Sequence, residues 1–191
     1  MPYAYVADVK LYRGIAPTET DDDTLIQELV DAAQSQIDSY CGRTFDAGTP
    51  STRYYDAVED VDQNGTRLWL GTDCCAVVTI TNGTGTAVTK YVTEPRNTTP
   101  FYAIRLKDSA GELFGYETDP QDAITVLGRW AYSVTVPPAI HQAAVRLAAY
   151  MYAQKDAQVF ETTLFPDAGV MTVPQGLPRD VEQLLKPFRK L

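Results

Sequence analysis

The sequence predicts an α+β protein, in which a small helical core carries an inserted antiparallel β domain. Two long stretches, at about 24–41 and 138–155, repeat apolar residues at the spacing of an amphipathic helix. The residues between them form short β-prone runs separated by turn signals. We therefore expect a helical core made of residues 1–49 and 133–191, and an inserted β domain made of residues 50–132.

Two helices are expected before the β domain. The first is a short helix over residues 6–13, since Gly14 follows it and glycine commonly ends helices. The second, at about 24–41, is followed by Gly42 in the same way. Consecutive acids before it can cap its free N–H groups and interact favourably with the helix dipole. These acids are Asp21, Asp22 and Asp23.

Six short strands are expected in the inserted domain. Their ranges are 52–58, 66–70, 76–81, 87–93, 101–107 and 123–127. Two Asn-Gly pairs, at 64–65 and 82–83, lie between such runs, and this dipeptide is a strong hairpin signal. Short strands without a helix-length apolar run favour a small antiparallel sheet or barrel.

The chain after the β domain combines helices with an irregular segment. The helix at about 138–155 begins with proline and is rich in alanine, which permits close approach of another helix. A last short helix is expected from Pro178 onward. Between them, residues 156–176 have no helical period, and unstructured connections of this length are uncommon and usually functional or disordered.

Residues 156–176 are the predicted partner contact, either as a hairpin or as an extended arm. The turn-forming residues at 167–169 lie midway along the segment. The segment also holds several large apolar side chains, each worth roughly 1.5–3 kcal/mol when buried. The candidate assembly contacts among them are Phe160, Leu164, Phe165 and Met171. The alternative is that this segment simply caps the subunit's own core.

The charge of the chain is unevenly distributed. Residues 1–63 contain 4 basic and 13 acidic side chains, which accounts for the whole net charge of −9, while residues 64–191 contain 12 of each. This distribution argues against sequence-independent DNA binding, which needs clustered Lys and Arg. The candidate acidic face consists of Asp21, Asp22, Asp23, Glu28 and Asp31. The weakly basic C-terminal segment adds Arg179, Lys186 and Arg189 as candidate assembly contacts.

The unequal charge has three interpretations. It can be an ordinary solvated surface, a pair of complementary faces, or a wall that repels a polyanion.

No apolar run approaches the roughly 20 residues needed to cross a bilayer, and no secretory signal is visible at the start. Three cysteines, an odd number that includes the vicinal pair at 74–75, indicate synthesis in a reduced, intracellular compartment.

No motif in the sequence predicts catalysis, a metal or a cofactor. Residues 60–65 match the start of a calcium loop, but the twelfth position is Gly71 instead of a bidentate Glu. The single histidine, His141, has no Cys or acid at a ligand spacing. The Gly-Thr run at 83–90 leads into a strand and lacks the phosphate-loop pattern. Nothing marks a pair of carboxylates for hydrolysis.

Four stretches of the chain carry a family resemblance. They are residues 40–45 (YCGRTF), 124–132 (ITVLGRWAY), 136–140 (VPPAI) and 177–188 (LPRDVEQLLKPF). Their combination resembles the head–tail connector (adaptor, or head completion) proteins of tailed bacteriophages and related prophages. The resemblance covers most of the chain, and its motifs are helix boundaries, not catalytic signatures.

The resemblance implies a structural virion protein, made in the cytoplasm of the bacterial host. Such proteins have a helical core and assemble, usually as a twelve-fold ring, beneath the portal vertex. The ring extends the DNA channel, through which the viral DNA passes without specific binding, and offers a docking surface to a tail or next neck protein. Simpler members are almost wholly helical, so the large β insert departs from the pattern and its role is open.

Two other classes of function are open from the residues alone. In one, the chain is a monomeric binding module whose β domain holds a sugar or peptide on a helical support. In the other, it is a small hydrolase that uses carboxylates of the insert, although a second histidine, a nucleophile motif and a metal cluster are all missing.

The ring that the resemblance implies needs two different faces of the subunit that match one another, and complementary charge would set their register.

Overall fold

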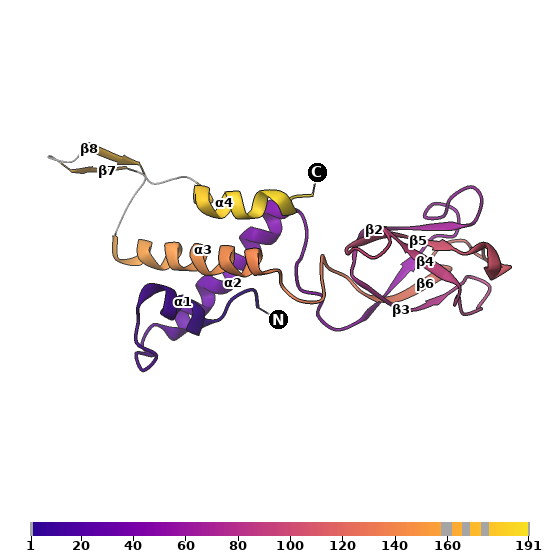
Figure 1. Cartoon of the computed structure of the whole chain (residues 1–191), viewed down its shortest axis with the longest axis horizontal. Helices are drawn as coiled ribbons and strands as arrows, with labels where there is room; N and C mark the ends of the chain where they lie inside the picture. Colours follow the sequence, from indigo (N-terminus) through magenta and orange to yellow (C-terminus); the bar gives the residue numbers. More distant parts are fainter. Residues whose placement is uncertain (1, 158–161, 166–168, 173–175, 191) are drawn as a thin grey trace. The chain divides into compact units, whose positions relative to one another are not determined.

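The computed structural model describes residues 2–157, 162–165, 169–172 and 176–190. The chain divides into two compact units (Figure 1). A helical unit comprises Met1–Arg43 and Val136–Leu191, and a β unit comprises Thr44–Thr135. The described residues form four α-helices and two three-stranded antiparallel sheets, so the α+β class is confirmed.

The helical unit is built from helices close to the predicted ranges. They are α1 (Val6–Arg13), α2 (Asp23–Cys41), α3 (Pro138–Ala157) and α4 (Arg179–Leu185), the last followed by the 3-10 turn η2 (Lys186–Phe188). α3 contacts the other three helices. In Figure 1, α1 and α4 lie on different sides of α3. Among the described residues of the helical unit and the β unit, no helix is long and apolar enough to cross a membrane.

Small residues on α3 allow its close packing against α2. Ala143, Ala144 and Ala148 are fully buried on α3, and α2 buries Ile26 and Ile37 among its core residues. Without long side chains at these positions, the two backbones can approach closely, and the isoleucines lose contact with water. Each buried isoleucine contributes roughly 1.5–3 kcal/mol of transfer free energy.

The ends of the helices are partly as predicted. Gly14 and Gly42 have the left-handed conformation, with φ of 71° and 65°, and end α1 and α2. The expected side-chain cap of α2 is wrong, because Asp22 is the N-cap residue but makes no capping hydrogen bond. Its carboxylate instead accepts hydrogen bonds from Lys155 and Tyr152 of α3. In the bond with Lys155 both partners are charged, whereas a backbone N–H at a cap is a neutral donor.

The N-terminal segment is fastened to the helices by hydrogen bonds. The Tyr3 hydroxyl donates to Asp38 at 2.5 Å, and the backbone N–H of Tyr3 donates to Gln34 at 3.1 Å. His141 Nδ1 lies 2.8 Å from the Tyr3 carbonyl oxygen, which can only accept, so Nδ1 carries the proton. His141 therefore has a structural role inside the helical unit.

The β unit contains two antiparallel sheets with a common core. The first has the order β1 (Ser51–Tyr55), β6 (Ile124–Arg129), β3 (Ala76–Thr81), and the second β2 (Arg67–Cys74), β5 (Phe101–Leu106), β4 (Tyr91–Glu94). A 3-10 turn, η1 (Asp108–Ala110), follows β5. Fully buried residues from both sheets pack in one apolar cluster, including Leu68, Ile80, Ile104, Ile124 and Val126.

The two Asn-Gly pairs do not join neighbouring strands as hairpins, which corrects the expectation. β1 and β3 both pair with β6, so neither pairs with the strand that follows it. Each Asn-Gly pair lies instead in a local turn closed by an isolated bridge, Val61↔Leu68 in one case and Thr81↔Ala87 in the other. A turn signal determines where the chain reverses, whereas burial of the sheet faces determines which strands pair.

A glycine is required at position 83 because a side chain would not fit there, and not because of its backbone angles. Its φ is not positive, but a Cβ there would lie 2.4 Å from the Gly115 carbonyl oxygen and 2.8 Å from the Ala123 Cβ. Any larger residue would push the turn away from residues 115 and 123. The Gly-Thr run therefore has a packing role, in agreement with the absence of a phosphate-loop pattern.

The segment between α3 and α4 contains a short antiparallel hairpin. Its strands are β7 (Thr162–Phe165) and β8 (Gly169–Thr172), with Leu164 paired to Val170 and Thr163 to Met171. The hairpin form of the predicted arm is thus present in the backbone. A two-stranded hairpin is at best marginally stable alone in water.

Candidate assembly surfaces

Three large hydrophobic residues on α1 and the residue before it are exposed, with Leu11 and Tyr12 lining different cavities. Tyr5 is 53% exposed, Leu11 82% and Tyr12 57%, and we call these three residues the α1 patch. They are the large hydrophobic residues that the described part of the helical unit leaves exposed. α1 buries only Val9 and Lys10, so most of the helix surface faces solvent.

α1 is held firmly in place in spite of its exposure. The Asp8 carboxylate accepts a hydrogen bond from the Tyr5 N–H at 2.8 Å and so caps the start of the helix. The Lys10 ammonium is almost completely buried and lies 2.7 Å from Asp23 Oδ1 at the start of α2. Because a buried charge without a partner is costly, this ion pair fixes α1 against α2. The α1 patch is therefore displayed on a rigid element.

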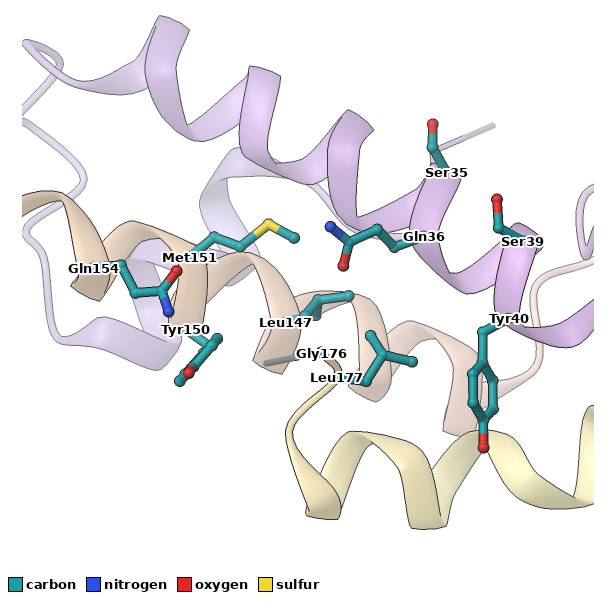
Figure 2. Close-up of a pocket in the computed structure, with 10 residues that line it drawn as sticks. All are labelled: Ser35, Gln36, Ser39, Tyr40, Leu147, Tyr150, Met151, Gln154, Gly176 and Leu177. Carbon is teal, nitrogen blue, oxygen red and sulfur yellow. The ribbon is translucent and has the colours of Figure 1, made fainter. Parts of the chain in front are cut away.

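A groove of about 560 Å³ lies between α2 and α3 next to the start of α4 (Figure 2). We call it the α2–α3 groove. Its lining residues are Ser35, Gln36, Ser39, Tyr40, Leu147, Tyr150, Met151, Gln154, Gly176 and Leu177. Figure 2 shows Met151 of α3 and Gln36 of α2 pointing toward one another across it. Apolar side chains meet there with hydroxyl and amide groups, and none of the lining residues is charged.

Tyr150 carries an unsatisfied polar group beside this groove. Its hydroxyl oxygen is buried and has no hydrogen-bond partner among the described residues. Leaving a buried hydroxyl unpaired costs about 1–3 kcal/mol. The same residue lines a second cavity, with Tyr12 of α1 and Asp180 of α4. A group that enters either cavity could satisfy this hydroxyl.

The predicted acidic face is partly neutralised within the helical unit. The Asp22 carboxylate lies 2.8 Å from the Lys155 ammonium and 2.6 Å from the Tyr152 hydroxyl. These two hydrogen bonds hold the pKa of Asp22 below its ordinary value, and the bond from Lys155 has the larger effect. Asp23 is paired with Lys10. The other three are exposed, namely Asp21, Glu28 and Asp31, the last accepting a hydrogen bond from Gln27 at 3.0 Å.

The basic C-terminal residues are exposed on α4 and after it. Arg179, Lys186 and Arg189 all face solvent, and the Arg189 guanidinium lies 5.5 Å from the centre of the Tyr40 ring. The acids of α4 are engaged with other helices: Asp180 lies 3.3 Å from Arg146, and Glu182 accepts a hydrogen bond from Tyr40 at 3.2 Å. The surface around α4 therefore keeps an exposed positive component.

The predicted arm is described only in part. Phe160 lies outside the described residues. Leu164 and Phe165 belong to β7 and Met171 to β8, and the structure describes the backbone of these strands but not the side chains. Their role in assembly stays a prediction.

The calcium-like loop uses its acids for turn formation. Asp62 Oδ1 accepts hydrogen bonds from the N–H groups of Thr66 and Arg67 at 2.7 and 2.8 Å. Burial acts to raise the pKa of Asp62, but these N–H donors and the Thr66 hydroxyl outweigh it and lower the pKa. Asp60 accepts from the Asp56 N–H at 2.8 Å. Within the described ranges, no group of three His, Cys, Asp or Glu residues could hold a metal.

The β unit exposes a stacked aromatic pair that the sequence analysis missed. Trp69 of β2 is 41% exposed and Tyr102 of β5 53%, with ring centres 6.1 Å apart and planes within 15°. The Arg67 guanidinium lies 5.0 Å from the Trp69 ring centre and is held by Glu94 at 2.9 Å. Alternation in the predicted strand 66–70, where Trp69 stands between two buried leucines, could have identified the exposed tryptophan.

The sequence analysis also missed the α1 patch. The helix at 6–13 was expected, but Leu11 and Tyr12 were assigned to no surface. The signal was available, because α1 carries apolar residues at 9, 11 and 12, and these cannot all lie on one narrow face.

Comparison with known proteins identifies a family that matches almost the whole chain. The model of the family described as head completion protein matches residues 4–191. A chain in the structure "Neck of empty GTA particle computed with C6 symmetry" is similar, with a TM-score of 0.58 and 16% identity over 97% of this chain and 89% of that one. A chain in "Virion of native gene transfer agent (GTA) particle" gives a TM-score of 0.51 and 15% identity over the same shares. No protein with a curated description matches. The family match spans both the helical unit and the β unit, and on that ground the chain belongs to the head completion protein family.

Proposed function

We propose that this chain is a structural protein of the neck of a phage-like particle. It forms a ring adaptor between the portal and the tail or next neck protein, and it extends the channel for DNA. The observation that carries this proposal is the family match over residues 4–191. The similarity of fold to a chain of a particle neck supports it over 97% of this chain. The chain acts in the virion after synthesis in the host cytoplasm, and it has no enzymatic role.

A ring arrangement is supported by the presence of two different apolar surfaces. A closed ring repeats one heterologous contact, in which one surface of a subunit meets another surface of its neighbour. The α1 patch and the α2–α3 groove are candidates for the two sides of that contact. The related neck structure was computed with C6 symmetry, which rings of six and of twelve subunits both satisfy. We propose twelve subunits, as in the connector proteins that the sequence resembles.

The exposed acids favour passage of DNA without binding. Asp21, Glu28 and Asp31 are exposed on or before α2. A DNA-binding surface would need clustered cations to neutralise phosphates. Acids that face the channel would keep the DNA from adhering during packaging and ejection.

Electron microscopy with a portal protein tests the proposal. The purified chain, alone and mixed with the portal protein of the same particle, is imaged by negative staining and sized by light scattering. We expect a ring of portal width that binds coaxially to the portal. A chain that stays monomeric and leaves the portal unbound at every concentration would contradict the adaptor function.

The hairpin β7–β8 is proposed to contact a partner protein. Replacing Phe165 and Met171 by Ser should leave the free energy of unfolding of the monomer within about 1 kcal/mol, while association with the ring or portal is lost. Thr163→Ser with Thr172→Ser changes the same strands without removing an apolar group and is the matched control. If the first pair unfolds the monomer while surviving rings still form, the segment belongs to the core.

A second candidate function is supported by the aromatic pair of the β unit. Trp69 and Tyr102 lie nearly parallel and offer an exposed surface that combines apolar rings with an N–H and an O–H group. The chain would then be a binding module for a sugar or peptide. Titration of the full chain with cell-surface oligosaccharides should change tryptophan fluorescence, and Trp69→Ala should abolish binding while Tyr54→Ala on the other sheet does not. Absence of binding across a glycan array would exclude the sugar.

A further inference from the structure

We propose that Asn64 is a site of spontaneous deamidation, and that the fold protects the other Asn-Gly pair, Asn82 and Gly83, from the same reaction. The chain contains three asparagines, Asn64, Asn82 and Asn97, and all of them lie in the β unit. Two of them precede a glycine, and the proposed function gives neither pair a role. The inference goes beyond the neck function and holds whether or not the chain forms a ring.

The reaction joins the side chain of an asparagine to the backbone of the next residue. The backbone nitrogen of that residue loses its proton and attacks the side-chain Cγ, so that a new C–N bond forms, the C–N bond of the side-chain amide breaks and ammonia leaves. Water then opens the resulting succinimide ring, with one water consumed for each ammonia released. Opening at one carbonyl gives aspartate, and opening at the other gives isoaspartate, which has an additional methylene in the backbone. Glycine is a favourable next residue, because it has no Cβ to hinder the attack.

Asn64 meets the conditions for this reaction. It is exposed in the turn between Asp62 and Gly65, and its side chain makes no hydrogen bond within the described part of the chain. The Gly65 N–H donates to the Asp62 carbonyl at 2.9 Å, and this bond has to open before the nitrogen can attack. Exposed turns open locally at a free energy well below that of global unfolding. Asn64 can therefore react while the rest of the β unit stays folded.

Asn82 is held in a position that prevents the reaction. It is only 2% exposed, and its side-chain amide donates to the Leu113 carbonyl at 2.8 Å. Its Oδ1 accepts hydrogen bonds from the N–H groups of Gly83 at 2.9 Å and Gly115 at 3.0 Å. The nitrogen that would attack is thus bonded to the oxygen of the group under attack. These three hydrogen bonds have to break in a buried position before the side chain can turn, which requires local unfolding of the β unit.

The two Asn-Gly sites have the same local sequence, so a difference between them comes from the fold. Each asparagine is followed by glycine and then threonine, at residues 64–66 and 82–84. In the unfolded chain both sites should therefore react at similar rates. The third asparagine, Asn97, precedes Thr98, whose β-branched side chain hinders attack by its own nitrogen. The chain thus contains an exposed site, a protected site of the same sequence and an unfavourable site.

Isoaspartate at position 64 would disturb the turn as well as its charge. Gly65 donates its N–H to the Asp62 carbonyl, and its own carbonyl accepts from the Phe114 N–H at 2.8 Å, so it ties the turn to a second segment. A Cβ on Gly65 would lie 3.2 Å from the Leu113 Cβ, which leaves little room for a displaced backbone. An additional methylene before Gly65 therefore breaks at least one of these bonds. In the particle proposed above the protein is not replaced after assembly, so the change accumulates with the age of the particle.

Peptide mapping of the folded and the denatured chain tests the site. The full chain is incubated in mildly alkaline buffer made with heavy-oxygen water, with and without guanidinium chloride, and the peptides that contain residues 64, 82 and 97 are quantified by mass spectrometry. We expect similar conversion of residues 64 and 82 in the denatured chain. In the folded chain, residue 64 should convert at least about tenfold faster than residue 82, since residue 82 has to unfold locally first. Equal rates at the two sites of the folded chain, or an intact Asn64 after the denatured chain has reacted, would overturn the inference.

Two substitutions at the exposed position 64 test the effect on the turn. Asn64→Gln keeps the amide but closes the larger ring much more slowly, so the aged variant should keep its fluorescence unfolding transition. Fresh Asn64→Asp has the charge of the product without the additional methylene and should unfold like fresh wild type. We expect the aged wild type to unfold at a lower denaturant concentration, in proportion to its isoaspartate content. An aged wild type rich in isoaspartate that unfolds like fresh protein, or a fresh Asn64→Asp that unfolds as early as the aged wild type, would overturn the effect assigned to the methylene.

Discussion

The helical unit and the β unit bury their apolar residues in different ways. The β unit encloses its core between two sheets, and apart from the stacked pair Trp69 and Tyr102 its exposed large hydrophobic residues lie on separate strands and loops, from Tyr54 to Val134. The helical unit has its exposed large hydrophobic residues on α1 and the residue before it, and an open groove between α2 and α3. Single exposed apolar residues need no explanation, whereas a groove lined by apolar side chains is a candidate interaction site. On this comparison we expect the assembly contacts in the helical unit and expect the β unit to be dispensable for them.

Removal of the β unit is the strongest test of this comparison. The Tyr132 N–H donates to the Thr44 carbonyl at 2.9 Å, so the chain enters and leaves the β unit side by side. Residues 50–132 are replaced by a short Gly/Ser linker. We expect the circular dichroism signal of the β strands to disappear and that of the helices to remain, because the closure of such a loop costs little free energy. The shortened chain should still form rings.

Two outcomes would break the comparison. Loss of all helical signal on removal of residues 50–132 would show that the helical unit depends on the β unit. A soluble helical chain that no longer forms rings would place an assembly contact in the β unit. A control chain with the same linker inserted after Gly48 and the β unit retained would show whether the linker itself disturbs assembly.

Cavity-forming substitutions test whether the two units unfold separately. Ile37 of α2 and Ile104 of β5 are both fully buried, one in each unit. Either change to Ala should cost about 2–5 kcal/mol. Both tryptophans, Trp69 and Trp130, lie in the β unit, so fluorescence follows that unit, whereas far-UV circular dichroism mainly follows the helices.

We expect each substitution to affect only one of the two probes. Ile104→Ala should move the fluorescence transition to lower denaturant concentration and leave the helical transition in place, and Ile37→Ala should do the reverse. If both probes shift together in both variants, the two units unfold as one cooperative body. The different ways in which they bury apolar residues would then not correspond to separate unfolding free energies.

The sequence predicted the positions of helices and strands in both units better than it predicted which of these elements contact one another. The helix at 6–13 has the observed bounds of α1, because Gly14 in the left-handed conformation ends it locally. Strand positions such as Ala76–Thr81 followed from a short β-prone run bounded by turn signals. The pairing of β1 with β6 did not, since it joins residues about seventy positions apart and depends on which faces become buried.

The candidate surfaces were harder to predict for the same reason. Which side of α1 faces solvent depends on where α2 and α3 pack, so Leu11 gave no signal by itself. The α2–α3 groove combines residues 35–40 with residues 147–177, which come together only in the folded unit. The acidic face was identified from charge, but sequence could not show that Lys10 and Lys155 would pair with Asp23 and Asp22.

The Lys10–Asp23 ion pair provides a smaller test of the helical unit. The Lys10 side chain is 6% exposed and the Asp23 side chain 39%, so Asp23→Asn leaves a nearly buried cation with a weaker partner. We expect a loss of about 1–3 kcal/mol in the free energy of unfolding and weaker ring assembly, because α1 is no longer fixed. Asp21→Asn, at an exposed neighbour, should change stability by less than about 0.5 kcal/mol. Equal effects of the two variants on assembly would mean that charge alone, and not the position of α1, matters.

The smallest expected effect is the response of the β unit to calcium. Both carboxylate oxygens of Asp62 already accept hydrogen bonds from residues 66 and 67, and the loop lacks the bidentate Glu that a calcium loop needs. Added Ca²⁺ or EDTA should therefore leave the melting temperature unchanged. Asp62→Ala is the positive control, since loss of these acceptors should cost about 1–3 kcal/mol. A shift of several degrees with Ca²⁺ in the wild type, lost in Asp62→Ala, would show that the turn binds metal and that the β unit carries a site of its own.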